Sequence, residues 1–488
     1  MSDTLPRLNR QLAASIKPLS ASAPVKVVQF GEGVFLRGFV DWIFYTLNQS
    51  GCFHGSIAVV QPIAQGRVAD LRRQDGLYTL FLRGIEQGRI RQERQIIDVI
   101  SQCIDPYADF DSYLRLAENP DLQVVVSNTT EAGITWLPGC SLHDRPAASY
   151  PAKLTQFLYH RFLTFSGDAA KGLILLPCEL IDRNGDHLRD HILHHAADWD
   201  LPAAFTSWLL QNCRFCNTLV DRIVTGFPRN EIAELQAEAG YQDDFYDTAE
   251  YFHLWVIEGK QEPALPFADA GLNVIWTDNL ARYRDRKVRV LNGLHTATFA
   301  AALLSGVETV GAALTDPDIH EYMTQTLYRE IIPTLPLSRQ ESEQYAAAVL
   351  ERFANPFIEH RWLSIALNSI SKFKVRVLPS LLAYGQQQNA QPRHLSFAFA
   401  ALLLFYRGGA EAKPADDPAI IDFFTSAWAA CDPTSASSLD QLVSTLLGRT
   451  ELWEQDLTLI PGLAGFVSEQ LGRQINLGMR EAVRQLDS

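Results

Sequence analysis

The sequence predicts an α/β protein in which a Rossmann-like domain with a parallel sheet is followed by a mainly α-helical domain. The chain has 488 residues, more than one ordinary domain contains. In the first 280 residues, short β-branched runs alternate with longer segments of helical composition, which is typical of a parallel sheet with crossover helices. Beyond residue 285 apolar residues recur at helical spacing. The expected domains are residues 1–284 and 285–488.

The expected strands of the first domain are apolar along their whole length, which favours burial on both faces of a parallel sheet. They cover residues 25–30, 56–62, 122–130, 172–180 and 272–278. Two further segments within residues 76–100 predict an inserted antiparallel hairpin. In the second domain, helices are expected in residues 293–306, 343–354, 395–408 and 440–449.

Composition and charge exclude several classes of function. The formal net charge of -14 disfavours a nucleic-acid or anionic-membrane partner. The N-terminus has no apolar signal core, and the longest apolar run, residues 395–406, is too short to span a bilayer. Seven scattered cysteines form no disulfide framework and indicate a reducing compartment. We therefore expect a cytoplasmic protein with a small-molecule partner, either a monomer or a dimer.

The first expected strand leads into a glycine-rich turn and then into a segment able to start a helix. Gly31 and Gly33 permit a tight turn and the close approach of a pyrophosphate to a helix N-terminus. The third glycine of the usual fingerprint is replaced by Leu36, and the second strand ends at Gln61 instead of an acid. Gln61 offers an amide to a ribose hydroxyl. The pattern predicts a dinucleotide cofactor and leaves the choice between NAD and NADP open.

A second set of small polar residues follows a later strand of the same sheet. Ser127, Asn128 and Thr129 end the run at 122–130. Since ligands of open α/β sheets bind beyond the carboxyl ends of the strands, these residues are candidates to contact the ribose or nicotinamide. The alternative is a turn that only closes the strand.

Three polar residues precede an apolar run in residues 287–306. On a helix with about 100° per residue, His295 lies about 80° and Asn292 about 140° around from Lys287, so all three share one half of the surface. A desolvated lysine near a positive helix end has a lowered pKa and can exchange a proton. Asn292 can donate to a substrate oxygen, and His295 can orient a hydroxyl. The alternative is a helix start with a satisfied core histidine.

With these residues in view, the chain resembles the polyol-specific long-chain dehydrogenases of the mannitol dehydrogenase family. Segments 177–185 and 216–224 resemble two further motifs of the family, although Glu179 and Leu180 depart from its pattern. The positions that match the family's motifs are Gly31, Gly33, Phe35, Arg37, Phe39, Asn184, Gly185, Asn217, Asp221, Arg222, Lys287, Asn292 and His295.

The resemblance implies an NAD-dependent, metal-independent oxidoreductase. In this family the lysine is the general base, here Lys287, and Asn292 and His295 are ligands of the substrate oxygen. Asn184 and Asp221 are then candidates for substrate binding. The expected cofactor-binding residues are Gly31, Gly33, Phe35, Arg37, Gln61, Ser127 and Asn128.

Within the family, segments 29–42, 125–133 and 365–381 resemble the branch that acts on hexuronates. The implied reaction is the reversible NADH-dependent reduction of the ketone of tagaturonate to altronate. A hexuronate carries a carboxylate, for which Lys372, Lys374 and Arg376 offer cations. A solvated basic helix face is the alternative for these three residues.

Other functions remain open at this level. One is a fructuronate, mannonate or neutral polyol dehydrogenase, and another is a nucleotide-sensing binding protein without catalysis. Four histidines at near-helical spacing raise the question of a metal site, but solvated helix histidines are common and we expect no metal. These histidines are His187, His191, His194 and His195.

Overall fold

The computed structural model describes residues 5–20, 22–86, 88–130, 132–408 and 413–487. The chain forms two compact units that divide between Leu280 and Ala281. The sequence alone placed this division after residue 284. Helix α10, Ala281–Arg286, spans that position and runs directly into the next helical segment, so its residues belong to the second unit.

The first unit contains a six-stranded parallel sheet with the strand order β5-β2-β1-β6-β7-β8. Numbered by their order along the chain, these strands run 3-2-1-4-5-6, which is the arrangement of a doubly wound dinucleotide-binding sheet. Strand β1 lies at the centre, where Val28 is paired with Ala58 on one side and Val125 on the other. The strands are β1 Val25–Phe30, β2 Ser56–Val60, β5 Ile100–Ile104, β6 Val124–Ser127, β7 Ile174–Pro177 and β8 Arg214–Phe215.

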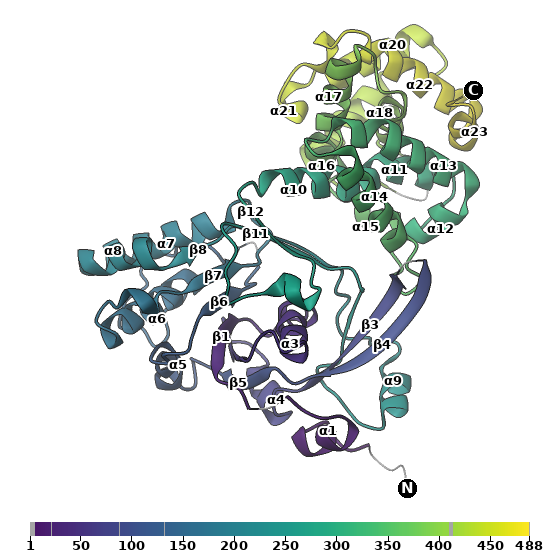
Figure 1. Cartoon of the computed structure of the whole chain (residues 1–488). Coiled ribbons are helices and arrows are strands. Elements are labelled where there is room, and N and C mark those ends of the chain that lie inside the picture. The colour runs from purple at the N-terminus through teal and green to yellow at the C-terminus, as the bar shows by residue number, and fades with distance from the viewer. Residues whose placement is uncertain (1–4, 21, 87, 131, 409–412, 488) are drawn as a thin grey trace. The chain divides into compact units, whose positions relative to one another are not determined.

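The six-stranded sheet separates two apolar cores. Val27 of β1 packs into one core, whereas Val28 and Phe30 pack into the other, as expected when successive side chains point to opposite faces. Figure 1 shows α5, α6, α7 and α8 on one side of the sheet and α3 on the other. The helical segments of this unit are α1 Arg10–Ile16, α2 Val34–Leu36, η1 Arg37–Asp41, α3 Trp42–Gln49, α4 Val68–Arg73, α5 Phe110–Ala117, α6 Tyr150–Thr164, η2 Ala169–Lys171, α7 Asn184–Asp198, α8 Ala203–Asn212, α9 Ile232–Ala239 and η3 Phe267–Ala270.

Two three-stranded sheets accompany the main one. The predicted hairpin is confirmed as β3 and β4, with β10 added parallel to β3. The expectation that residues 272–278 belong to the main sheet is wrong: β12 pairs only with β11, whose other neighbour is β9. The strands of these sheets are β3 Tyr78–Glu86, β4 Arg89–Ile97, β9 Thr218–Asp221, β10 Asp247–Ala249, β11 Leu254–Glu258 and β12 Val274–Thr277.

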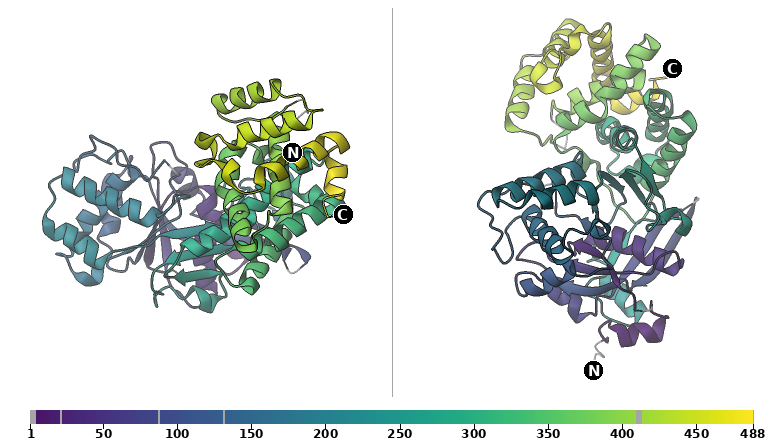
Figure 2. Two further views of the ribbon diagram at one scale, coloured as in Figure 1. Left: turned by 90° about the horizontal axis from the view of Figure 1, so that it is seen from above. Right: turned by 60° about the vertical axis from the view of Figure 1, so that its left-hand side comes forward.

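The second unit is built from helices packed on one another, as Figure 2 shows for the green to yellow part of the chain. Its centre is formed by α11 and α18, in which nearly every residue is buried. Apolar side chains on all sides of these two helices explain their burial. The segments are α10 Ala281–Arg286, η4 Lys287–Asn292, α11 Gly293–Leu304, α12 Val310–Thr315, α13 Pro317–Gln325, η5 Thr326–Ile331, η6 Ile332–Thr334, α14 Arg339–Phe353, α15 Trp362–Ile365, α16 Ser369–Arg376, α17 Leu378–Gln388, α18 Arg393–Phe405, α19 Pro418–Ala429, α20 Ala436–Leu447, α21 Thr450–Trp453, η7 Leu457–Leu459, α22 Leu463–Leu477 and α23 Met479–Arg484.

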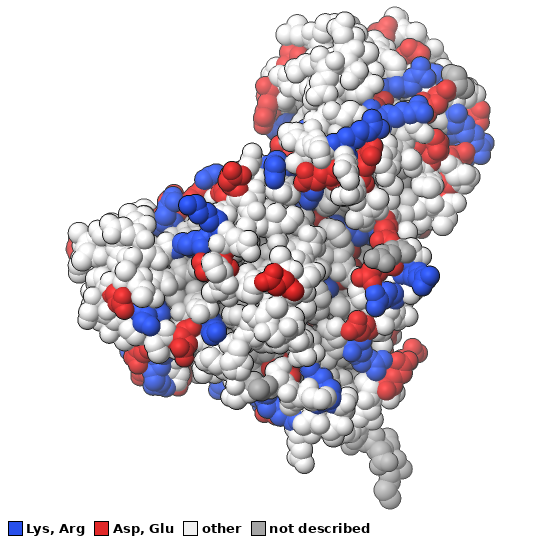
Figure 3. Space-filling model, viewed as in Figure 1, with Lys and Arg blue, Asp and Glu red and all other residues white. Residues whose placement is uncertain are grey.

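The surface carries charges of both signs, as expected from the numbers of acidic and basic residues in the sequence. Figure 3 shows acidic and basic side chains interspersed on the face in view of each unit. Within the part of the chain that the structure describes, no helix combines the length and the apolar character needed to cross a bilayer.

Candidate active site

The two glycines after β1 have different structural roles. Gly31 has a φ of 121°, and its N–H donates to the carbonyl oxygen of Val60 at 3.0 Å. A side chain there would be strained and would lie 3.1 Å from Leu36 Cδ1. Gly33 has an ordinary φ of -65° and caps the N-terminus of the helix that begins at Val34, and a Cβ added to it would meet nothing within 4 Å. The backbone therefore needs Gly31, while Gly33 keeps open space in front of a helix N-terminus, where a phosphate is stabilised.

The helical run after these glycines holds Phe35 and Arg37 in different environments. Phe35 stacks on Phe39 with ring centroids 5.1 Å apart. Arg37 is buried, donates from Nη1 to the carbonyl oxygen of Glu32, and places Nη2 3.7 Å from Asp247 Oδ2. The prediction that Arg37 contacts the cofactor needs correction, because its guanidinium holds the glycine turn from inside the fold.

A buried set of charges surrounds Arg37. The Tyr78 hydroxyl oxygen lies 2.8 Å from the Arg37 carbonyl oxygen and 3.1 Å from Asp41 Oδ2, and its single proton can be donated to either of them. Burial raises the pKa of Asp41 and of Asp247 to about 7, against a smaller lowering by Arg37. Burial also lowers the pKa of Arg222 to about 9. The segment that carries the glycine turn is thus anchored by buried ionisable groups, and burial raises the pKa of the two carboxyl groups among them.

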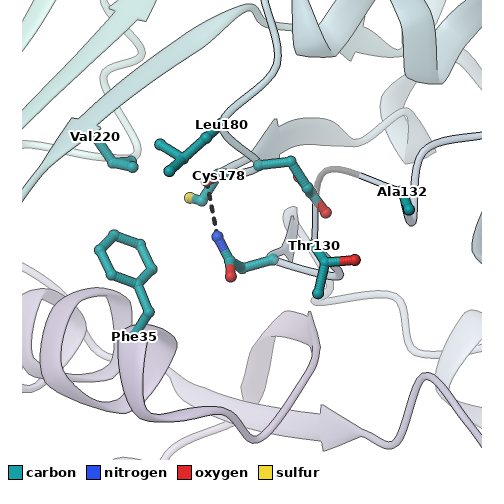
Figure 4. A pocket seen from close by; sticks show the side chains of 8 residues that line it. Phe35, Thr130, Ala132, Cys178, Leu180 and Val220 are labelled. Carbon is teal, nitrogen blue, oxygen red and sulfur yellow. Dashed lines mark hydrogen bonds between the residues drawn. The ribbon is translucent and has the colours of Figure 1, made fainter. Parts of the chain in front are cut away.

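The ends of β6 and β7 are tied together by Glu179. Its Oε2 accepts from Ser127 Oγ at 3.1 Å, and its Oε1 accepts from Thr129 N at 2.9 Å and Thr129 Oγ1 at 3.0 Å. Asn128 Nδ2 donates to the Cys178 carbonyl oxygen at 2.8 Å, the bond drawn as a dashed line in Figure 4. Burial raises the pKa of Glu179. Sequence reasoning noted this acid only as a departure from the family motif and missed its part in the site.

These strand ends border a cavity of about 580 Å³ in the first unit, a size typical of small-molecule sites. Figure 4 shows Phe35 and Val220 on one side of it, with Leu180, Thr130 and Ala132 around the remainder. The cavity lies beyond the carboxyl ends of β1, β6 and β7, where doubly wound sheets bind dinucleotides. The lining residues are Phe35, Asn128, Thr130, Ala132, Cys178, Glu179, Leu180 and Val220.

Gln61 is buried at the end of β2, and its amide is occupied by the turn that follows. Its Nε2 donates to the carbonyl oxygens of Ile63 at 2.9 Å and Ala64 at 3.2 Å. Both amide hydrogens are therefore used within the chain. The predicted donation to a ribose hydroxyl is not available in this arrangement, and only the Oε1 acceptor remains.

Asn184 is also placed differently from the prediction. Its Nδ2 lies within hydrogen-bond distance of three main-chain oxygens, those of Pro177, Glu179 and Thr218, at 3.0 to 3.2 Å. Its Oδ1 accepts from Thr218 N at 2.8 Å and Gly185 N at 2.9 Å. The side chain therefore joins the start of α7 to β9, and its role as a substrate ligand stays a prediction. Asp221, the other predicted substrate ligand of this unit, is buried at the end of β9.

Lys287 and Asn292 lie in the π-helical segment η4 of the second unit. The expectation that Lys287 stands near a positive helix end is wrong, because α10 precedes it without a break. The expected angle of 140° between Lys287 and Asn292 also changes. In a π-turn residues five apart become neighbours, as residues four apart do in an α-helix. Asn292 and His295 are three apart at the start of α11, so the three side chains follow one face.

His295 is buried with an exposed fraction of 6% and is enclosed by rings. Phe353 stacks on it at 4.1 Å between ring centroids, and His360 meets it edge-on at 4.9 Å. Burial, followed by the charges of His360, Arg352 and Arg376, holds the pKa of His295 well below its usual range. Its Nε2 has no hydrogen-bond partner among the described residues. Burial thus favours the neutral form of the imidazole, and the described residues leave the hydrogen-bonding capacity of its buried Nε2 unused.

The cations predicted for a substrate carboxylate are separated by the structure. Lys374 forms an ion pair with Glu454, with Nζ 2.7 Å from Oε1. Lys372 lies on another face of α16, because residues two apart do not face each other on a helix. Its Nζ donates to the carbonyl oxygen of Ile365 at 2.9 Å. Lys374 thus already has a carboxylate partner, whereas Lys372 has none among the ion pairs of the described residues, and both stay predictions for the substrate carboxylate.

The four histidines of α7 do not converge. His194 stacks on Trp136 at 4.6 Å, and the buried His195 packs against Trp199 at 5.3 Å. The pKa values of His191 and His195 are lowered, and burial makes the largest contribution to both shifts. Among the residues with described positions, no group of three or more histidines, cysteines or carboxylates is arranged to hold a metal ion.

Sequence comparisons place both parts of the chain in one family. The pattern of the mannitol dehydrogenase Rossmann domain matches residues 25–266, and that of the mannitol dehydrogenase C-terminal domain matches residues 279–473. The chain therefore belongs to the mannitol dehydrogenase family, as its motifs predicted.

Two relatives with similar sequences are both named altronate oxidoreductase. The relative from Yersinia enterocolitica serotype O:8 / biotype 1B is 48% identical over 468 residues, which cover 95% of this chain and 97% of the relative. The relative from Shigella flexneri is 46% identical over 472 residues, which cover 96% and 98%.

Two solved structures confirm the fold class. D-sorbitol dehydrogenase in its substrate-free form matches with a TM-score of 0.78 and 22% identity, covering 98% of this chain and 100% of that structure. Pseudomonas fluorescens mannitol 2-dehydrogenase in a ternary complex with NAD and D-mannitol matches with a TM-score of 0.67 and 22% identity, covering 98% and 99%. At this identity the likeness concerns the fold.

Proposed function

We propose that the protein is an NAD-dependent altronate oxidoreductase, which reversibly reduces the ketone of tagaturonate to the corresponding hydroxyl group of altronate. The observation that carries this proposal is an identity of 46% to 48% with altronate oxidoreductases along at least 95% of the chain. The strand order, the glycine turn and the cavity at the strand ends support an enzyme that binds a dinucleotide.

The residues of the first unit fit NAD. The open space at Gly33 and the helix that follows it suit the pyrophosphate, and the cavity lined by Phe35 and Asn128 suits the nicotinamide riboside. Ser127 supports the cofactor site indirectly, because its hydroxyl donates a hydrogen bond to Glu179 and so helps to position that side chain. When bound as NADH, the cofactor supplies the hydride that adds to the ketone carbon.

The residues of η4 and α11 carry out the proton transfer to the ketone oxygen and hold that oxygen in place. In the reducing direction Lys287 gives a proton from its ammonium group to the ketone oxygen and is left as the neutral amine. Asn292 and the neutral His295 hold that oxygen, and the side-chain amide of Asn292 has no hydrogen-bond partner among the described residues. In the oxidising direction Lys287 takes the hydroxyl proton back. The buried Asp221 stays a candidate substrate ligand of the other unit.

A substrate panel tests this function. NADH oxidation is followed with tagaturonate, fructuronate and fructose, and again with NADPH in place of NADH. We expect tagaturonate with NADH to give the highest kcat/KM. A preference for fructuronate would move the assignment to the mannonate branch, and turnover of fructose alone would make the protein a neutral polyol dehydrogenase. Absence of turnover with all three, together with NADH binding, would favour a nucleotide-sensing protein.

A further inference from the structure

The last residue of α16, Arg376, is a partly buried cation without a partner. Its guanidinium makes no hydrogen bond or ion pair with any residue that the structure describes, and burial is the only cause that lowers its pKa. Other shielded arginines of this unit are paired: Arg286 with Glu341, and Arg480 with Asp316. A cation removed from water without a counter-charge is costly unless a ligand supplies one.

Arg376 lies beside the residues proposed for proton transfer. Helix α16 packs on both η4 and α11. At this contact a Cβ added to Gly293 would lie 2.8 Å from the Arg376 carbonyl oxygen, so the two backbones nearly touch. Gly293 directly follows Asn292 and stands two residues before His295, whose pKa is lowered in part by the charge of Arg376.

A second cation lies on the same face of α16. Lys372 and Arg376 are four residues apart and therefore neighbours on the helix, and the charge of Arg376 lowers the pKa of Lys372. Two like charges at this spacing destabilise a helix. Lys374, on another face of the helix, forms an ion pair with the carboxylate of Glu454. The unpaired positive charge of α16 is thus concentrated on the side that carries Arg376.

Resting on the proposed function, we infer that Arg376 binds the carboxylate of the hexuronate substrate, with Lys372 as its neighbouring cation, and so sets the preference for a sugar acid over a neutral sugar. A guanidinium presents two parallel N–H groups that match the two oxygens of a carboxylate. The hydroxymethyl group of a neutral ketose offers neither the charge nor the second acceptor. The substrate itself would then supply the missing counter-charge of Arg376.

The test compares two substrates in Arg376→Met, which keeps much of the side-chain volume without the charge. One substrate is tagaturonate, and the other is the ketohexose with a hydroxymethyl group in place of the carboxylate. We expect kcat/KM for tagaturonate to fall by about 10- to 100-fold, mainly through KM, because charged hydrogen bonds are lost. The value for the neutral ketose should stay within about two-fold. Arg376→Lys should recover part of the loss, since it keeps the charge without the fork.

The matched control is Arg339→Ala, which removes one positive charge from the same unit. The Arg339 side chain is 78% exposed and pairs with Glu343 on the surface of α14, so the ratio of the two kcat/KM values should not change. Equal losses for both substrates in a folded Arg376→Met, or no loss for either, would overturn the inference. Failure of the wild-type enzyme to reduce tagaturonate would instead overturn the proposed function, so the two failures are distinguishable.

Discussion

At the scale of single residues, the chemistry depends on Lys287, which is partly buried in η4. We predict that Lys287→Ala lowers kcat for tagaturonate by about 10² to 10⁴, the range that general acid–base groups supply. NADH binding, measured by fluorescence titration, should be unchanged because the predicted cofactor residues lie in the first unit. Turnover is measured at several pH values between 6 and 9. Retention of more than about a tenth of the activity at every pH would remove Lys287 from the mechanism.

Gly31 and Gly33 allow a comparison of two alanine substitutions in the same turn, one expected to affect stability and the other cofactor binding. Gly31→Ala places a side chain at a φ of 121° and should lower the free energy of unfolding by about 1 to 3 kcal/mol. Gly33→Ala has a permitted φ of -65° and no neighbour within 4 Å, so stability should be unchanged while KM for NADH rises. Chemical denaturation and NADH titration separate the two effects. An unchanged KM in Gly33→Ala would mean that no phosphate approaches this glycine.

Asn184 separates a structural role from a binding role. Replacement by Ala removes the side-chain acceptor of the buried Thr218 N–H, at a cost of about 1 to 3 kcal/mol, while the Pro177 carbonyl oxygen keeps its hydrogen bond from Thr218 Oγ1. We expect Asn184→Ala to lower the melting temperature and to change kcat/KM for tagaturonate and for the neutral ketose by the same factor. A selective effect on one substrate at unchanged stability would show that the side chain leaves its main-chain partners during catalysis.

At the scale of elements, the segments with strong apolar periodicity were predicted correctly. The central strands, the hairpin and the helical second unit all follow from local patterns in the sequence. Strand β5 and the pairing of β12 were not predicted, because β5 follows the hairpin after only two residues and the partner of β12 is set by distant parts of the chain. Sequence patterns carry no record of such long-range pairing.

The site was predicted as a list of residues, while their directions were not. Arg37 and Asn184 match family motifs, but the structure turns their polar atoms toward the main chain and buried charges. A motif shows which residue type stands at a position and does not show which neighbour satisfies it. The π-turns at η1 and η4 were also missed, since one extra residue in a turn hardly alters the apolar pattern.

At the scale of the whole molecule, stability should respond to pH through the buried carboxylates of the first unit. Burial raises the pKa of Asp41 from its ordinary value of 3.8 to about 7 in the folded chain. Between these values the folded state holds a proton that the unfolded state lacks. The contribution of Asp41 to the free energy of unfolding is therefore fully present below pH 3.8 and is lost as pH rises toward 7, by about 1.4 kcal/mol per pH unit at most.

Asp41→Asn tests this dependence because an amide mimics the neutral acid. The stability of the variant relative to the wild type should increase from pH 5 to pH 7 and then level off, as measured by denaturant unfolding at each pH. Asp70→Asn, a change at a partly exposed carboxylate, is the control and should show no such trend. Parallel curves for Asp41→Asn and the wild type would contradict the assignment of this pH dependence to Asp41.

The π-turn of η4 has a consequence for how this enzyme tolerates change in length. Deleting one residue between Lys287 and Asn292 would let residues 281–304 wind as a regular α-helix, with the apolar contacts of α11 preserved. The lysine would then stand four residues before the asparagine and seven before the histidine, so the three side chains would still share one face. Such a shortened chain should therefore fold and keep the three side chains together, so this helix tolerates the loss of a single residue within the π-turn.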